Sequence, residues 1–388
     1  MESYRTTLFI LISVLGFSCS QQPSPSGTAS PKPKFSYEVI ADDLMMPWNL
    51  EIGPDSYLWA TDQVKKVIRI SRRDHSQDII KLEHFERDSF YMLGMAFHPD
   101  FSNNGLLYLS ALYPPITEMT TGYVDVFMAK YDSVRKTISM EALIIDSLHT
   151  PQSHNPGGRM KITKDQKLIV VASCEVDVYE AQDMDNLSGK MLRFNLDGSI
   201  PEDNPFPGSP IYTLGHRNPQ GIMIMDDGSI YISEHGPVTD DEFNKVEPGA
   251  NYGWPIVRGI SDTEEEKRIC DTLKVNEALC FWTPTIAPSS LLYYHHSKLP
   301  SLQGKFLIST LKENDIRVVN LESEQKAVEE QIIFNEMFGR IRDMEADDDG
   351  NLYFSTANIL PVGRTAYDHM KKDTTLRYDV IVKVFGEN

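Results

Sequence analysis

The chain has 388 residues, enough for two or three average domains or for one closed β-propeller. Its 56 acidic and 37 basic residues give a net charge of -19, which disfavours nucleic acid and anionic lipid as partners because both are negatively charged. A neutral or metal-assisted ligand suits this surface, although the charge serves solubility equally well.

The first residues have the pattern of an export signal. Arg5 is followed by an apolar stretch over residues 8–17, which is shorter than the about 20 residues of a membrane-spanning helix. The Leu-Gly-Phe-Ser-Cys sequence that ends at Cys19 resembles a bacterial lipobox, so we expect a lipoprotein-type signal peptide over residues 1–19 and a lipid on Cys19. Residues 20–34 contain four prolines and are predicted to be a flexible tether. We therefore expect the protein in the periplasm or cell envelope, with membrane contact only through this anchor.

One short pattern recurs six times along residues 35–388. Each copy has a turn rich in Asp, Gly or Asn, followed by alternating apolar residues that end near Ser or Thr. The copies are marked by Leu58, Leu107, Leu168, Ile230, Phe306 and Leu352. These markers lie about 59 residues apart on average, which is the size of one propeller blade.

A second apolar run follows several copies, as at residues 67–70, 191–194 and 316–319. Two adjacent strands across a turn make half of a four-stranded blade. We therefore predict one all-β domain over residues 35–388, a six-bladed β-propeller with four-stranded antiparallel blades. A pair of β-sandwiches is the alternative. An α/β fold is disfavoured because no segment has a long apolar period of 3.6 residues.

Loops from successive blades meet at the mouth of a propeller's channel, where ligands bind. Before the third repeat, His154 stands in a loop with Pro156, Gly157 and Gly158. Such a backbone presents one side chain, and a neutral imidazole can accept a hydroxyl proton. An isolated histidine, however, is more often structural.

Cationic and amide side chains stand in three later segments. Arg217 and Asn218 offer donors and acceptors that suit a flat ligand with carboxylates, although a surface ion pair is the alternative for Arg217. Arg340 and Arg342 occupy alternate positions of a predicted strand and so share a face, and Lys312 follows the fifth repeat. Neighbouring like charges need an anion, and we expect that anion to be the ligand.

An acidic segment over residues 233–255 provides oxygen ligands for a metal. Its carboxylates and the carbonyls of its Gly and Pro turns resemble the six to eight hard oxygens that Ca²⁺ prefers. Acidic turns commonly bind nothing, so a solvated loop is the alternative. Cys270 and Cys280 lie ten residues apart beyond this segment, a spacing that permits a disulfide and leaves the pairing open.

Taken together, these strings resemble the PQQ-dependent soluble glucose and aldose sugar dehydrogenases. The matching motifs, in order, are MPW at 46–48, LGMAFHPDF at 93–101, HNPGGRM at 154–160, SGKMLR at 188–193, GHRNPQG at 215–221, SEHGP at 233–237, DEFN at 241–244, NYGWP at 251–255, WTPTIAP at 282–288 and GRIRD at 339–343. The resemblance runs from about residue 46 to residue 356.

The resemblance implies that an aldose is oxidised at C1 to the lactone by hydride transfer to calcium-bound PQQ, with His154 as the general base. It implies that PQQ is bound by Arg217, Asn218, Lys312, Arg340 and Arg342. Backbone carbonyls of Gly236 and Pro237 would hold a Lewis-acid calcium ion, and Glu242 with the backbone of Tyr252 would hold a structural one. The expected partners are an aldose substrate and an electron acceptor of the respiratory chain.

The sequence departs from the family at the expected cofactor pocket. Ser89 stands about where the family has a cofactor-binding Gln, and bulky Phe90 and Tyr91 follow it. The Asp that supports the catalytic His in the family is replaced by Cys174. These changes favour the alternative function, a non-redox, calcium-stabilised propeller that binds a sugar or a protein partner. A lactonase-type hydrolase is disfavoured because the acidic residues gather in one loop instead of several blades.

Overall fold

The computed structural model describes residues 35–62, 66–85, 90–113, 122–150, 156–174, 177–261, 263–323, 326–358 and 379–387. By its contacts, Lys34–Asn388 forms one unit. Within this unit, the described strands form four sheets of four strands and one sheet of eight.

The eight-stranded sheet contains, in spatial order, β2 (Pro47–Ile52), β3 (Leu58–Asp62), β4 (Lys66–Ile70), β5 (Gln77–Glu83), β9 (Thr137–Thr150), β8 (Gly122–Asp132), β7 (Leu106–Tyr113) and β6 (Tyr91–Phe97). All its neighbouring strands are antiparallel except β5 and β9, which pair in parallel. That pairing divides the sheet into two antiparallel units, β2 to β5 and β6 to β9.

Each of the other four sheets is also an antiparallel unit. The first contains β10 (Met160–Ile162), β11 (Lys167–Val171), β12 (Lys190–Asn195) and β13 (Ile211–Leu214), and the second contains β14 (Pro219–Ile224), β15 (Ile230–Glu234), β16 (Asp241–Val246) and β17 (Cys280–Trp282). The third contains β18 (Pro288–Tyr294), β19 (Lys305–Thr310), β20 (Ile316–Ser323) and β21 (Lys326–Ile333), and the fourth contains β22 (Ile341–Ala346), β23 (Leu352–Thr356), β24 (Asp379–Glu387) and β1 (Phe35–Leu44).

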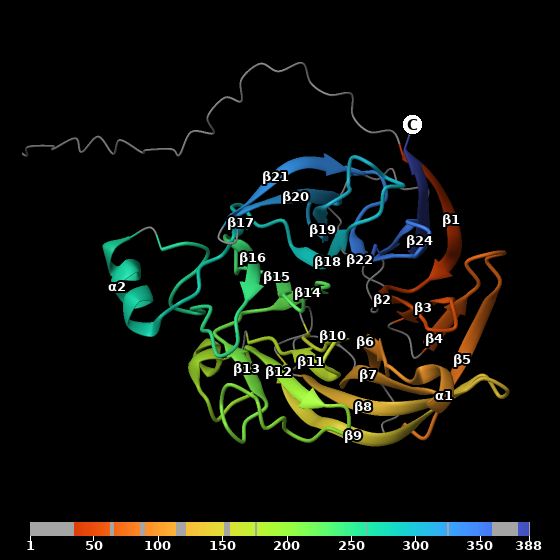
Figure 1. Ribbon diagram of the computed structural model, residues 1–388, viewed down its shortest axis with the longest axis horizontal. Helices are drawn as coiled ribbons and strands as arrows, with labels where there is room; N and C mark the ends of the chain where they lie inside the picture. The colour runs from red at the N-terminus through yellow and green to blue at the C-terminus, as the bar shows by residue number, and fades with distance from the viewer. Residues whose placement is uncertain are drawn as a thin grey trace, which may run out of the picture. The chain divides into compact units, whose positions relative to one another are not determined.

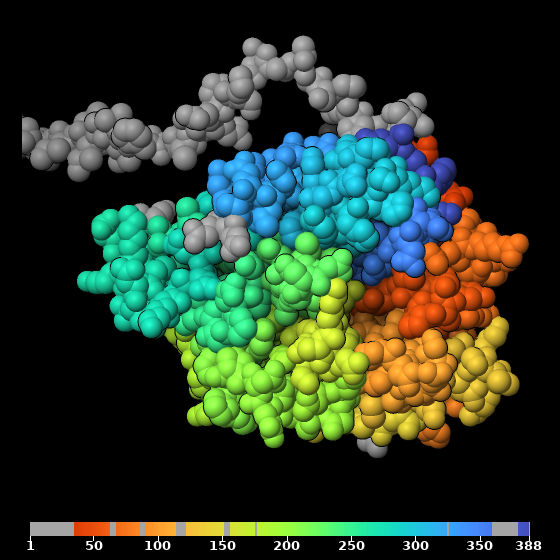
Figure 2. All heavy atoms as spheres, in the orientation of Figure 1, coloured from red at the N-terminus to blue at the C-terminus, as the bar shows by residue number. Residues whose placement is uncertain are grey.

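The first strands of the units form a closed ring. β2, β6, β10, β14, β18 and β22 contact one another in this order, and β22 contacts β2 again. The sheets extend outward from this ring, and the chain passes around it in sequence order (Figures 1 and 2). The prediction of an all-β propeller with four-stranded antiparallel blades is confirmed. The blade number of six stays a prediction. The division of the described strands into antiparallel units agrees with it.

The six repeated segments of the sequence coincide with β3, β7, β11, β15, β19 and β23, the second strand of each unit. Both faces of these strands are covered by neighbouring sheets, so residues of either orientation are apolar. In β23, Leu352 and Phe354 pack in one core cluster while Tyr353 packs in another. This double burial explains why the second strands carry the strongest apolar signal.

Both ends of the described chain meet in one sheet. β1 pairs with β24 so that Phe35 lies opposite Glu387 and Leu44 opposite Asp379. The N-terminal strand therefore completes the sheet that the C-terminal segment begins.

Helical structure is sparse in the described part of the chain. It comprises α1 (Phe101–Asn104), the 3₁₀ turn η1 (Val178–Gln182) and α2 (Glu264–Leu273), which projects from the sheets between β16 and β17 (Figure 1). A reciprocal capping box of Thr263 and Glu266 starts α2. No helix among the described residues is long and apolar enough to cross a membrane. Cys174, Cys270 and Cys280 are free thiols, so the disulfide that the spacing permits is not formed here.

Candidate active site

The predicted cofactor ligands gather at the N-terminal ends of the inner strands. Arg217 and Asn218 directly precede β14, Arg340 precedes β22, and Arg342 is the second residue of β22. These strands contact one another around the ring through β18. The fold therefore brings residues 217–218 and 340–342, which are far apart in the sequence, to one end of the ring.

The pKa of His235 shows that three of these cations lie near one another. Burial, and after it the charges of Arg217, Arg342 and Arg340, lower the pKa of His235 to about 3. The ring is 8% exposed, and its Nε2 atom lies 2.9 Å from the carbonyl oxygen of Pro288. Three of the five predicted cofactor ligands thus surround one buried, neutral imidazole.

Lys312 lies beside this group. Its exposed Nζ donates to the carbonyl oxygen of Thr285 at 2.8 Å, and the carbonyl of the preceding Leu311 accepts from Nη1 of Arg340 at 3.1 Å. Lys312 is therefore placed at the edge of the same cationic region.

Asn218 and Arg342 are joined by the side chain of Gln220. Nη2 of Arg342 donates to Oε1 of Gln220 at 2.8 Å, and Nε2 of Gln220 donates to Oδ1 of Asn218 at 2.8 Å. Nδ2 of Asn218 and the Nε atoms of Arg159 and Arg342 are buried and have no hydrogen-bond partner among the described residues. Leaving such donors unpaired costs roughly 1–3 kcal/mol each, so this end of the ring fits an anionic ligand rich in acceptors.

The predicted calcium ligands also come together. Gly236, Pro237, Glu242 and Tyr252 line one small pocket, of about 10 Å³, together with Arg217. Nη1 of Arg217 donates to the carbonyl of Gly236 at 2.7 Å. A carbonyl oxygen has two lone pairs, so this bond leaves one for a cation.

Glu242 is a buried carboxylate whose charged form is disfavoured. Burial, and after it the charge of nearby Glu234, raise its pKa to about 8. Its oxygens accept from the backbone N–H of Gly259 at 2.5 Å and from Nδ2 of Asn244 at 3.0 Å, and no ion pair with a described residue involves it. No group of three His, Cys, Asp or Glu side chains that could hold a metal occurs in the described part of the chain. A cation here would therefore be bound largely by carbonyls, as the sequence suggests.

Asp241 fixes the loop that carries these carbonyls. Its Oδ1 accepts from the N–H of Gly236 at 2.7 Å, and its Oδ2 accepts from the N–H groups of Ile286 and Ala287 at 2.6 and 2.7 Å. One buried carboxylate thus joins the loop after β15 to the loop before β18. Burial raises its pKa to about 6.

His154, the predicted general base, and Ser89 lie outside the described residues. Gly157, three residues after His154, is packed so tightly that an added Cβ would lie 2.6 Å from the carbonyl oxygen of Val171. Phe90 is buried and contacts the rings of Phe85 and Tyr113, with centroids 5.6 and 5.4 Å away. Its side chain therefore contributes to the core of the β6 to β9 unit.

Cys174 cannot replace the charge of the family's Asp. Burial raises the pKa of its thiol to about 12, and Sγ donates to the carbonyl of Asp177 at 3.1 Å. Its backbone instead supports the site, because its N–H donates to the carbonyl of Arg217 at 2.7 Å and its carbonyl accepts from Nε1 of Trp254 at 3.1 Å.

Four residues of the site carried no predicted role: Trp48, Arg159, Gln220 and His235. Trp48 is in β2 and Gln220 in β14, while Arg159 directly precedes β10. All four lie within the quoted motifs, but only their position at the starts of inner strands and at the end of β15 reveals that they meet.

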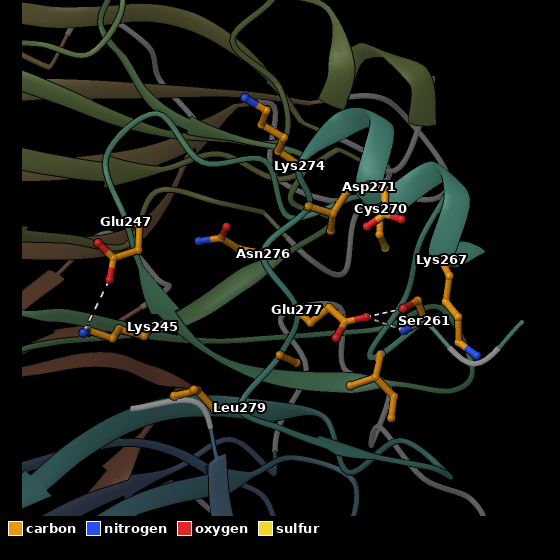
Figure 3. A pocket seen from close by; sticks show the side chains of 13 residues that line it. Lys245, Glu247, Ser261, Lys267, Cys270, Asp271, Lys274, Asn276, Glu277 and Leu279 are labelled. Carbon is orange, nitrogen blue, oxygen red and sulfur yellow. Dashed lines mark hydrogen bonds and ion pairs between the residues drawn. The ribbon is translucent and has the colours of Figure 1, made fainter. Parts of the chain in front are cut away.

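A larger cavity, of about 800 Å³, lies elsewhere, between α2, the end of β16 and residues 275–279. Figure 3 shows its polar lining, with Lys245 paired to Glu247 and Glu277 bonded to Ser261. None of the predicted site residues lines it. We assign the chemistry to the ring because the cations and unpaired donors gather there.

Comparison with known proteins identifies the family of the chain. Residues 44–359 match the family described as glucose/sorbosone dehydrogenase. The chain is 28% identical over 420 aligned residues to quinoprotein glucose dehydrogenase B of Acinetobacter calcoaceticus, covering 85% of this chain and 87% of that protein. It is 28% identical over 278 residues to aldose sugar dehydrogenase YliI of Escherichia coli, covering 68% of this chain and 74% of the relative.

A solved structure supports the fold. The PQQ-bound form of an aldose sugar dehydrogenase from Streptomyces coelicolor aligns with a TM-score of 0.71 and 24% identity, covering 92% of this chain and 99% of that one.

Proposed function

Because the chain belongs to the glucose/sorbosone dehydrogenase family, we propose that it is a PQQ-dependent dehydrogenase that oxidises an aldose at C1 to the lactone. The observation that carries the proposal is the set of buried, unpaired donors beside Arg217, Arg340 and Arg342 at one end of the ring. PQQ is planar, carries carboxylates and presents acceptors around its rim, so it complements these groups.

When bound, PQQ supplies an electron sink for the hydride of the sugar C1 carbon. Asn218 would donate to one of its oxygens, and Arg342, held by Gln220, would neutralise another. Arg217, Arg340 and Lys312 would bind the remaining anionic groups. Because Asn218 and Arg342 are buried, their interactions act in a low dielectric and are stronger than in water.

His154 is proposed to accept the proton of the C1 hydroxyl as the hydride leaves. The neutral form that this task needs is favoured in a cationic site, since nearby positive charges disfavour imidazolium. His235 illustrates the effect, because Arg217, Arg342 and Arg340 add to burial in lowering its pKa.

Calcium is proposed at two places. The carbonyls of Gly236 and Pro237 would hold an ion that serves as a Lewis acid, with Asp241 fixing their loop. Glu242 and the backbone of Tyr252 would hold a structural ion, which would compensate the buried carboxylate of Glu242.

We further propose export and lipid anchoring through Cys19, which places the site outside the cytoplasm. Electrons would then pass from the reduced cofactor to an acceptor of the respiratory chain. Residues 1–34 lie outside the described part of the chain, so labelling with a fatty-acid probe in wild type and Cys19→Ala tests the anchor directly.

The test of the activity is a titration of calcium-loaded apoprotein with PQQ, followed by addition of an aldose. We expect saturable binding seen in the cofactor's absorption, then bleaching by the sugar. His154→Ala should retain binding and lose bleaching, while His75→Ala, on the turn between β4 and β5, serves as the matched control.

A non-redox propeller that binds a sugar or protein partner is the second candidate. It is favoured by one observation, the neutral thiol of Cys174 where the family has a carboxylate. Absence of PQQ binding at micromolar concentration would select this candidate and reject the first.

A further inference from the structure

A buried ion pair crosses the centre of the ring. Nη1 of Arg159 lies 2.8 Å from Oδ1 of Asp343, and the two side chains are 3% and 2% exposed. Nη2 of Arg159 donates to the carbonyl of Ser289 at 3.1 Å. Arg159 precedes β10, Asp343 is in β22 and Ser289 is in β18, so one guanidinium joins three of the inner segments.

The other oxygen of Asp343 is also fully engaged. Oδ2 accepts from Nδ2 of Asn49 at 3.0 Å and from the N–H of Leu50 at 2.6 Å. Both donors belong to β2. Both oxygens of Asp343 therefore accept hydrogen bonds, one from Arg159 and the other from β2. Because all of these partners are donors, they stabilise Asp343 as a carboxylate.

Arg342 has no comparable partner. It is buried, its only hydrogen bond to a described residue runs to Gln220, and no carboxylate of a described residue lies within ion-pair distance of it. The guanidinium carbons of Arg159 and Arg342 lie 4.8 and 4.2 Å from the ring centroid of Trp48. Burial and the proximity of Arg159 lower the pKa of Arg342, whereas Asp343 raises it.

These contacts give a simple charge count. Two buried cations share one buried anion, so the cluster of Trp48, Arg159, Arg342 and Asp343 carries one uncompensated positive charge. We propose that Asp343 sets the anion affinity of the cofactor site by neutralising Arg159, so that of these two buried arginines only Arg342 offers its charge to a carboxylate of PQQ. This inference rests on the proposed function, and it makes Asp343 and Arg159 positioning residues that act through Arg342.

The inference predicts opposite effects for the two halves of the ion pair. Asp343→Asn leaves two uncompensated cations, so PQQ should bind about tenfold tighter. Arg159→Gln leaves the negative charge of Asp343 beside Arg342, so PQQ should bind at least about tenfold more weakly. A purely structural role would weaken binding in both variants, because each leaves a buried group unpaired.

The experiment measures the Kd of PQQ for calcium-loaded wild type, both variants and Asp347→Asn. Asp347 is an equally buried carboxylate, paired with Arg72 at 2.9 Å in the turn after β22, so its loss controls for removal of a buried ion pair. Tighter binding by Asp343→Asn with weaker binding by Arg159→Gln supports the inference. Weaker binding by both overturns it.

A second measurement keeps the two proposals separable if wild type does not bind PQQ. Arg342→Met keeps an apolar stem over Trp48 and removes the uncompensated charge, so the apoprotein should melt a few degrees higher, by roughly the gain expected for removing a buried unpaired charge. A higher melting temperature without PQQ binding would retain the charge count and reject the dehydrogenase. A lower melting temperature would overturn the charge count itself.

Discussion

Lys190 offers a quantitative test of the buried electrostatics beside the site. It is the first residue of β12, it is fully buried, and its Nζ donates to the carbonyls of Glu180 and Ser188 at 2.8 Å each. No ion pair with a carboxylate of a described residue involves it. Burial accordingly lowers its pKa from 10.5 to about 8.

The sign of the effect follows from where the proton binds. Below pH 8 the amine is charged in both the folded and the unfolded chain, and folding must bury that charge. Above pH 10.5 it is neutral in both states, and the cost is gone. The free energy of unfolding should therefore rise with pH across this window, by about 2 kcal/mol between pH 7 and pH 9.5.

Lys190→Met removes this dependence, along with two hydrogen bonds to carbonyls. The assay is urea unfolding of wild type and variant at pH 7 and pH 9.5. We expect the free-energy difference between the two proteins to shift by about 2 kcal/mol in favour of wild type at the higher pH. Titration of all other groups cancels in this difference. Lys130→Met, on an exposed position of β8, controls for loss of a lysine and should change stability by less than about 0.5 kcal/mol. A difference that stays constant with pH would refute the reasoning.

Two further predictions concern the loops of the site. Gly157→Ala places a Cβ 2.6 Å from the carbonyl oxygen of Val171, so it should cost about 1–3 kcal/mol of stability and lower kcat while PQQ still binds. The control is Gly386→Ala, whose Cβ would meet nothing closer than 3.6 Å. Equal kcat values in the two variants would contradict the prediction. Chelation of calcium with EDTA should lower the melting temperature of wild type more than that of Glu242→Gln in a thermal scan, because loss of the ion at Glu242 leaves its buried carboxylate uncompensated only in wild type. An equal loss in both proteins would place the calcium elsewhere.

The repeat was visible in the sequence because of how the second strands are buried. Leu352, Tyr353 and Phe354 are apolar in succession because Leu352 and Phe354 pack in one core cluster while Tyr353 packs in another. The inner strand β10 left no such signal, because it has three residues and one of them is Lys161. No local sequence pattern predicts the pairing of β1 with β24, since it joins segments far apart in the sequence.

Individual residues of the candidate site stand in sequence motifs, but the network that connects them is seen only in the structure. Arg217, Asn218 and Arg342 stand in motifs that suggest ligand binding, and the fold brings them together as those motifs imply. The roles of Trp48 and Arg159 depend on contacts across the ring, which no local pattern encodes. The engagement of Gly236 by Arg217 likewise became apparent only from the geometry.

The pairing of β1 with β24 has a consequence for how the molecule is made. A chain synthesised from its N-terminus releases Phe35–Leu44 first, and its partner strand, Asp379–Glu387, last. Until then β1 has no strand to pair with, and the ring stays open with unpaired edges that invite association with other chains. Ring closure is thus a late, long-range event, and the slowest step of folding should lie there because contacts of large sequence separation form slowly.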